Sequence, residues 1–106
     1  MTRYKLTVEY DGTDYVGWQR QDNGPSIQAE LERAVHAFCD EDAIVHGAGR
    51  TDAGVHAEAQ TAHVDIVKDV SADTVRDAMN HFLLDVPISV LRAEAVDDDF
   101  HARYGA

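Results

Sequence analysis

Hydrophobic and polar residues alternate along several stretches of the chain, which is the pattern of a strand with one buried face. In residues 4–10 the apolar positions are Tyr4, Leu6, Val8 and Tyr10. A similar alternation covers residues 59–67, and residues 43–47 form a shorter apolar run. Residues 88–96 predict a last strand, but the apolar positions change phase after Val90, so either both faces are covered or a bulge intervenes.

Two other stretches repeat apolar residues at the spacing of one helix face. The first follows Ser26, a candidate N-cap, and its apolar residues are Ile27, Leu31, Ala34, Val35 and Phe38. The second follows Ser71, ends at Pro87, and carries Val75, Ala78, Met79, Phe82 and Leu83. The element order is β-α-β-β-α-β. It predicts an α+β, ferredoxin-like domain, in which two helices cover one face of a four-stranded antiparallel sheet.

Length and composition narrow the class of protein. The 106 residues suffice for one compact domain. We expect a cytoplasmic protein, because no apolar run approaches the roughly 20 residues of a membrane helix and the start has no apolar region typical of a signal peptide. The single cysteine, Cys39, excludes an intramolecular disulfide and a cysteine-based metal site.

The chain is acidic, with 20 acidic against 9 basic residues and a net charge of -11. Nucleic-acid binding draws on clustered lysine and arginine, so the total charge argues against such a partner. However, Arg20, Arg50 and Arg103 lie in segments containing Gly, Gln or His that do not resemble core. Because salt screens charges over about 8 Å, a local arginine surface can coexist with an acidic remainder. Net charge alone therefore leaves the partner open.

A glycine-rich segment, residues 47–56, places Arg50 two positions before Asp52. The guanidinium favours an ionised carboxylate, and the glycines allow another molecule to approach the backbone. Asp52 could therefore act as a nucleophile or a base. By itself, a turn in which Asp52 pairs with Arg50 is the simpler interpretation, because aspartates are common in turns. The segment is neither a GxGxxG motif nor a P-loop, since its third glycine is misplaced and no lysine follows.

Three of the six histidines, His46, His56 and His63, could approach one another across the central strands. The chain has neither an HExxH motif nor zinc-type Cys/His spacing. We therefore expect packed or solvent-facing imidazoles and no metal.

Two segments carry side chains suited to RNA. Residues 18–21 combine an indole with planar hydrogen-bond donors, and we expect Trp18 in the core and Arg20 as the RNA contact. In residues 100–103 we expect Phe100 to pack, while His101 and Arg103 reach a ligand.

Three motifs span the chain in a fixed order. They are Tyr10-Asp11-Gly12 with Gly17-Trp18-Gln19-Arg20-Gln21, then GRTDAGVHA from Gly49 to Ala57, then Phe100-His101-Ala102-Arg103. Together these motifs resemble the tRNA pseudouridine synthase A family. The GRTDAGVHA run is highly specific for it, and it overrides the interpretation of Asp52 as a turn residue.

The resemblance implies that uridine is isomerised to pseudouridine in the anticodon stem-loop of tRNA, at positions 38–40, without cofactor or metal. Asp52 matches the catalytic aspartate of the family, whose carboxylate attacks the flipped-out nucleotide at either the sugar or the base. Arg50 would steady the loop or contact phosphates, and Arg20, His101 and Arg103 would contact RNA. Unstacking the target base costs a few kcal/mol, which contacts in the pocket must offset. The family also implies a homodimer.

The chain departs from the family in length. Family members continue with a second α/β half, which brings a tyrosine that stacks on the target base and an arginine that pairs with the aspartate. Residues 1–106 therefore resemble the N-terminal half alone. We expect this half to fold but to have little or no activity by itself.

Two other functions are compatible with the predicted fold. One is a non-catalytic RNA-binding module, although residues 4–10 and 59–67 lack the exposed aromatic clusters of an RRM. The other is a small-ligand regulatory domain that dimerises through its sheet. An Asp52→Asn variant separates them, because only a catalytic carboxylate has turnover to lose.

Overall fold

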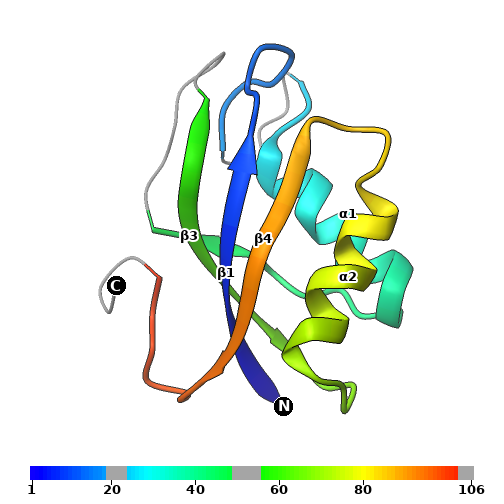
Figure 1. Ribbon diagram of the computed structural model, residues 1–106, viewed down its shortest axis with the longest axis vertical. Helices are drawn as coiled ribbons and strands as arrows, with labels where there is room; N and C mark the ends of the chain where they lie inside the picture. Colours follow the sequence, from blue (N-terminus) through cyan, green and yellow to red (C-terminus); the bar gives the residue numbers. More distant parts are fainter. Residues whose placement is uncertain (19–23, 49–55, 103–106) are drawn as a thin grey trace.

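The computed structural model describes residues 1–18, 24–48 and 56–102. Its sheet has the strand order β2-β3-β1-β4, and every neighbouring pair is antiparallel. Both helices lie on the same face of this sheet (Figure 1), so the predicted α+β, ferredoxin-like arrangement is confirmed. The elements are β1 (Thr2–Tyr10), α1 (Ile27–Cys39), β2 (His46–Gly47), β3 (Ala57–Ile66), α2 (Ala72–Phe82) and β4 (Ile88–Val96).

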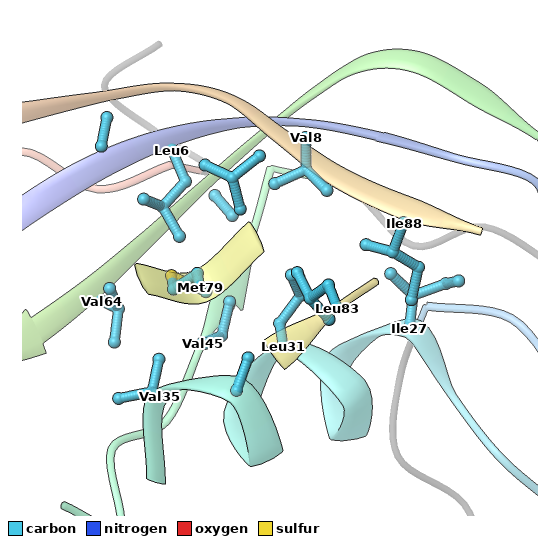
Figure 2. Close-up of a cluster of buried hydrophobic side chains, with 14 of the residues drawn as sticks. Leu6, Val8, Ile27, Leu31, Val35, Val45, Val64, Met79, Leu83 and Ile88 are labelled. Atoms are coloured by element: carbon cyan, nitrogen blue, oxygen red, sulfur yellow. The ribbon is translucent and has the colours of Figure 1, made fainter. Parts of the chain in front are cut away.

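The core lies between the helices and one face of the sheet (Figure 2). Every second residue of the central strand β1 is buried there, as its alternation predicts. Leu6 of β1 is paired in register with Ala62 of β3 and Ala93 of β4. The other residues of β1, including Arg3 and Lys5, therefore point to the face without helices, which we call the open face.

Both predicted N-caps are confirmed. The Ser26 side chain accepts a hydrogen bond from the backbone N–H of Ala29, and the Ser71 side chain accepts one from that of Thr74. The apolar stripe of α1 is buried at Ile27, Leu31, Ala34 and Val35, and that of α2 at Val75 and Met79. Phe82, predicted as part of the second stripe, is 37% exposed.

Strand β4 contains a bulge, which is one of the two alternatives that its sequence pattern allowed. Thr7 is paired with Arg92, but the next residue, Val8, is paired with Val90. Leu91 is thus an extra residue opposite β1, and 47% of it is exposed. Because of this extra residue, the side chains of Val90 and Ala93 both point to the buried face.

Several predicted boundaries were wrong. Residues 43–47 were expected to form a strand, but β2 contains only His46 and Gly47. The backbone of Val45 is bonded instead to side chains of α1: its N–H donates to Glu32 Oε2 over 3.0 Å, and its carbonyl accepts from Gln28 Nε2 over 3.1 Å. At the other boundaries, α2 ends at Phe82, before Pro87, and β3 begins at Ala57.

Among the described residues, no helix has the length and apolar character needed to cross a membrane.

Candidate functional site

Four of the five residues expected to act on RNA lie outside the described residues: Arg20, Arg50, Asp52 and Arg103. The fifth, His101, is described and half-buried. The chain on either side of residues 19–23 and 49–55, and the chain leading to residue 103, is also described.

The chain that enters residues 49–55 is held against Trp18. Gly47 lies so close to the indole that a Cβ on it would be 2.6 Å from Cε2 of Trp18. Trp18 is 3% exposed, which confirms its expected place in the core. Next in the chain, the N–H of Ala48 donates to the carbonyl of Thr61 over 2.8 Å. A glycine is thus required here because the indole occupies the space of a side chain.

The chain that leaves residues 49–55 is held by the turn after β1. Nδ1 of His56 accepts a hydrogen bond from the N–H of Gly12 over 3.0 Å and also lies 3.0 Å from Oδ1 of Asp11. The same Oδ1 accepts from the hydroxyl and the N–H of Thr13, at 2.6 and 3.0 Å. These bonds, led by that of the Thr13 hydroxyl, lower the pKa of Asp11 and keep its carboxylate ionised.

Trp18 is the last described residue before residues 19–23, and its indole packs on Gly47. The carbonyl of Trp18 accepts from the N–H of Gln28 over 2.9 Å, and that of Gly17 accepts from Ile27 over 3.1 Å. These bonds fasten the chain to the first turn of α1. The described chain before Arg20 and the described chain before Arg50 and Asp52 are therefore in contact, through Trp18 and Gly47.

The segment after β4 turns back over the open face beside β3 (Figure 1). Arg3 holds it, because Nη1 donates to the carbonyls of Asp98 and Phe100 at 2.8 and 2.5 Å. The remaining donors of Arg3 form a two-bond pair with Asp65, at 2.8 and 3.0 Å. As expected, the ring of Phe100 packs, with Nζ of Lys5 5.8 Å from its centre.

Three histidines meet where this segment crosses the sheet. The ligand atoms of His46, His63 and His101 all lie within 4.8 Å of one another. The predicted trio included His56 in place of His101, and this was wrong because His56 is bonded to the turn after β1. The pairing of His46 with His63 follows from strand register. The position of His101 depends on how the segment after β4 folds back, which carries no local sequence signal.

His63 is the fixed member of this cluster. It is 2% exposed, and its Nδ1 accepts the N–H of Ala102 over 3.1 Å. Burial, aided by the nearby charges of His46, Arg3 and His101, lowers its pKa to about 4. The ring is therefore neutral near pH 7, and its hydrogen sits on Nε2 because Nδ1 accepts a bond. In this arrangement His63 offers no free lone pair to a metal ion.

The sequence matches the family model described as tRNA pseudouridine synthase over residues 6–105. The chain belongs to this family. Along its whole length it is 58% identical to the tRNA pseudouridine synthase A of Paramagnetospirillum magneticum and 56% identical to that of Maricaulis maris. It is also 58% identical over its whole length to that of Nitrobacter winogradskyi. The chain spans 41%, 43% and 42% of these three proteins, respectively.

Membership of the pseudouridine synthase family bears on the contacts described above. The three family motifs are far apart in the sequence, yet each is tied to another part of the same region. Trp18 packs on Gly47, His56 binds Gly12, and Ala102 binds His63. Each of these contacts is made at β2 or β3 or at the ends of these strands, so the described parts of the three motifs all meet the β2–β3 edge of the sheet.

Proposed function

We propose that this chain is the N-terminal, Asp52-bearing part of a tRNA pseudouridine synthase that isomerises uridine in the anticodon stem-loop of tRNA. The observation that carries the proposal is the anchoring of the described parts of the family motifs at the β2–β3 edge of the sheet. Trp18 packs on Gly47, two residues before the GRTDAGVHA segment, and His56 near the end of that segment binds Gly12. A reactive loop needs such fixed ends, because small displacements of a catalytic group are costly.

Asp52 is the proposed nucleophile. Its carboxylate attacks the flipped-out uridine, at the ribose or at the uracil ring, and the bond from N1 to the ribose breaks. The base turns and rejoins the ribose through C5, which loses its hydrogen as a proton while N1 gains one. The bond between the nucleotide and the Asp52 carboxylate then breaks, which restores the free carboxylate. Substrate and product are isomers, so the reaction consumes no oxidant, reductant or cofactor. Arg50, two residues before Asp52, favours the ionised carboxylate that such an attack requires.

The RNA contacts are assigned to Arg50, Arg20, His101 and Arg103. A chain with net charge -11 repels a polyanion unless cations gather where the phosphates lie. Of the lysines, Lys5 lies against the Phe100 ring on the open face. The arginines of the motif segments would supply the remaining local positive charge, and salt would weaken RNA binding steeply.

The test uses an extended protein, in which residues 1–106 are followed by the part of the Paramagnetospirillum magneticum relative that lies outside its match. Isomerisation releases the hydrogen of C5, so tritium release from transcribed tRNA labelled at uridine C5 reports turnover. We expect release by the extended protein and none by its Asp52→Asn variant. Asp85→Asn, which removes an exposed carboxylate from the turn before β4, is the matched control and should leave release unchanged.

The same assay compares catalysis with RNA binding alone. If the folded extended protein bound tRNA but released no tritium from any tRNA tested, the catalytic proposal would fail and a non-catalytic RNA-binding module would remain. We expect residues 1–106 alone to fold without turnover, because the family places further active-site groups in its second half. We also propose that the longer protein is cytoplasmic and that it forms a homodimer. Sedimentation of the extended protein tests the oligomeric state.

A further inference from the structure

The imidazoles of His46 and His63 are stacked on the open face. Their ring centres are 4.7 Å apart and their planes differ by 17°. The two residues are paired in register on β2 and β3, so the stack is set by the strands. His101 closes one side, with ring centres 4.6 Å from His63 and 5.8 Å from His46.

The imidazole of His63, the buried ring of this stack, is held in place by its neighbours. His63 is 2% exposed and is bonded through Nδ1 to the backbone of Ala102. Phe100 meets it edge-on, with ring centres 6.3 Å apart and an interplanar angle of 86°. His46 thus rests on a neutral ring that is held from several sides.

This geometry suits stacking better than metal binding. The lone pairs of an imidazole lie in the plane of its ring, so two nearly parallel rings do not direct them at one point. Tetrahedral zinc sites require ligand atoms about 2.0–2.1 Å from a common ion. In addition, Nδ1 of His63 accepts the N–H of Ala102 and is therefore not available to an ion.

His46 is exposed although one of its faces is covered by His63. Its exposed surface therefore comprises the other face and the ring edge. β2 is an edge strand of the sheet, so no further strand of the described chain covers that side. Only Gly47 and Ala48 separate His46 from residues 49–55, which include Asp52.

We propose that the exposed ring face of His46 is a stacking platform for one unpaired nucleobase of the RNA, next to the base that Asp52 modifies. The inference rests on the proposed function and adds a binding contact to it. Unpaired RNA bases are commonly held by stacking on aromatic or histidine side chains. A supported ring at the surface loses little freedom on binding, which favours this use.

The first readout is the split between KM and kcat in the extended protein. Stacking of a neighbouring base contributes equally to the bound and the transition state, so its loss raises KM and spares kcat. We expect His46→Ala to raise KM about tenfold, within the range measured for base stacking on aromatic side chains. His46→Phe keeps a stacking ring and should stay within about twofold of the parent. His81→Ala, which removes an exposed histidine from α2, is the matched control.

The second readout is the fluorescence of 2-aminopurine, placed at one unpaired position at a time in an anticodon stem-loop RNA. In the Asp52→Asn background the RNA is held without turnover. Stacking on His46 predicts quenching at one position, lost in His46→Ala and kept in His46→Phe. If the His46→Ala variant still formed pseudouridine and had the KM and the quenching of the parent, the stacking platform would be wrong. The proposed function would be unaffected by that result.

Two other outcomes count against the platform. If the extended protein formed no pseudouridine, the proposed function would fail and the platform with it. The second outcome comes from titration with zinc chloride. Tight zinc binding that is lost in His46→Ala, His101→Ala and His63→Gln alike would show a metal centre in place of the stacking surface.

Discussion

The backbone N–H of Gly12 donates to Nδ1 of His56 over 3.0 Å, and this bond joins the turn after β1 to the end of the segment that carries Asp52. The same Nδ1 lies 3.0 Å from the Asp11 carboxylate. One nitrogen cannot accept from Gly12 and donate to Asp11 at once. The bond from Gly12 therefore uses the lone pair of Nδ1, and the Asp11 carboxylate is a close neighbour of this nitrogen and not its hydrogen-bond acceptor.

The first prediction concerns this bond. In the extended protein, His56→Leu removes the acceptor for Gly12 and should lower kcat roughly 10- to 100-fold, because the segment with Asp52 loses one of its fixed ends. His56→Asn keeps a side-chain acceptor and should recover part of the loss. Tritium release from tRNA measures both. His36→Asn, on the exposed side of α1, is the control, and an equal loss in His56→Asn and His56→Leu would argue against a role for the acceptor.

The second prediction concerns Gly47. Its Cβ position is 2.6, 2.7 and 2.9 Å from Cε2, Nε1 and Cζ2 of Trp18. Gly47→Ala should therefore lower the free energy of unfolding by about 1–3 kcal/mol through overpacking. Phenylalanine lacks these three indole atoms, so Gly47→Ala should cost less in a Trp18→Phe background. Urea unfolding of the four proteins in this double-mutant cycle gives the coupling, and strictly additive effects would contradict the clash.

The third prediction is a pH dependence due to His63. Its pKa is lowered from 6.5 to about 4 in the folded protein, chiefly by burial. The unfolded state thus binds more protons between these values, so stability is full above about pH 6.5 and falls as the pH decreases toward 4. The loss should reach up to about 3 kcal/mol. The charges of His46, His101, Arg3 and Asp65 act on His63, and Lys5 is paired with it in register.

Urea unfolding of residues 1–106 between pH 4 and pH 7 tests this pH dependence. His63→Gln keeps a side-chain acceptor for Ala102 but does not titrate, so it should flatten the dependence in this window. His81→Gln should retain the parent slope. A slope that is the same in His63→Gln and the parent would assign the effect to other groups.

The fourth prediction concerns Arg3, which joins Asp65 to the carbonyls of Asp98 and Phe100. Arg3→Lys keeps the charge but cannot reproduce a planar, forked set of donors. We expect the segment after β4 to open more often in this variant. Amide hydrogen exchange at Ala102 should therefore speed up roughly tenfold, while exchange at Leu6 in the core stays near that of the parent. Arg92→Lys, an exposed arginine of β4, should leave Ala102 unchanged.

The elements of this protein were predictable because local chemistry specifies them. The alternation in residues 4–10 and the serines at positions 26 and 71 were enough to place β1 and the starts of both helices. The phase change after Val90 allowed either a bulge or a strand covered on both faces, and the pairing of Val8 with Val90 shows that it is a bulge. The family motif containing Asp52 is likewise a property of the sequence, since residues 49–57 are contiguous.

Other features depend on contacts between residues far apart in the chain. The extent of β2 was set by Glu32 and Gln28, which bond the backbone of Val45 from α1 and take the place of a strand neighbour. His101, and not His56, joined His46 and His63, because Arg3 and His63 fold the segment after β4 back over the sheet. Periodicity and capping thus determined which segments are helix or strand. The tertiary structure alone decided which of their side chains meet, because that depends on how the segments pack.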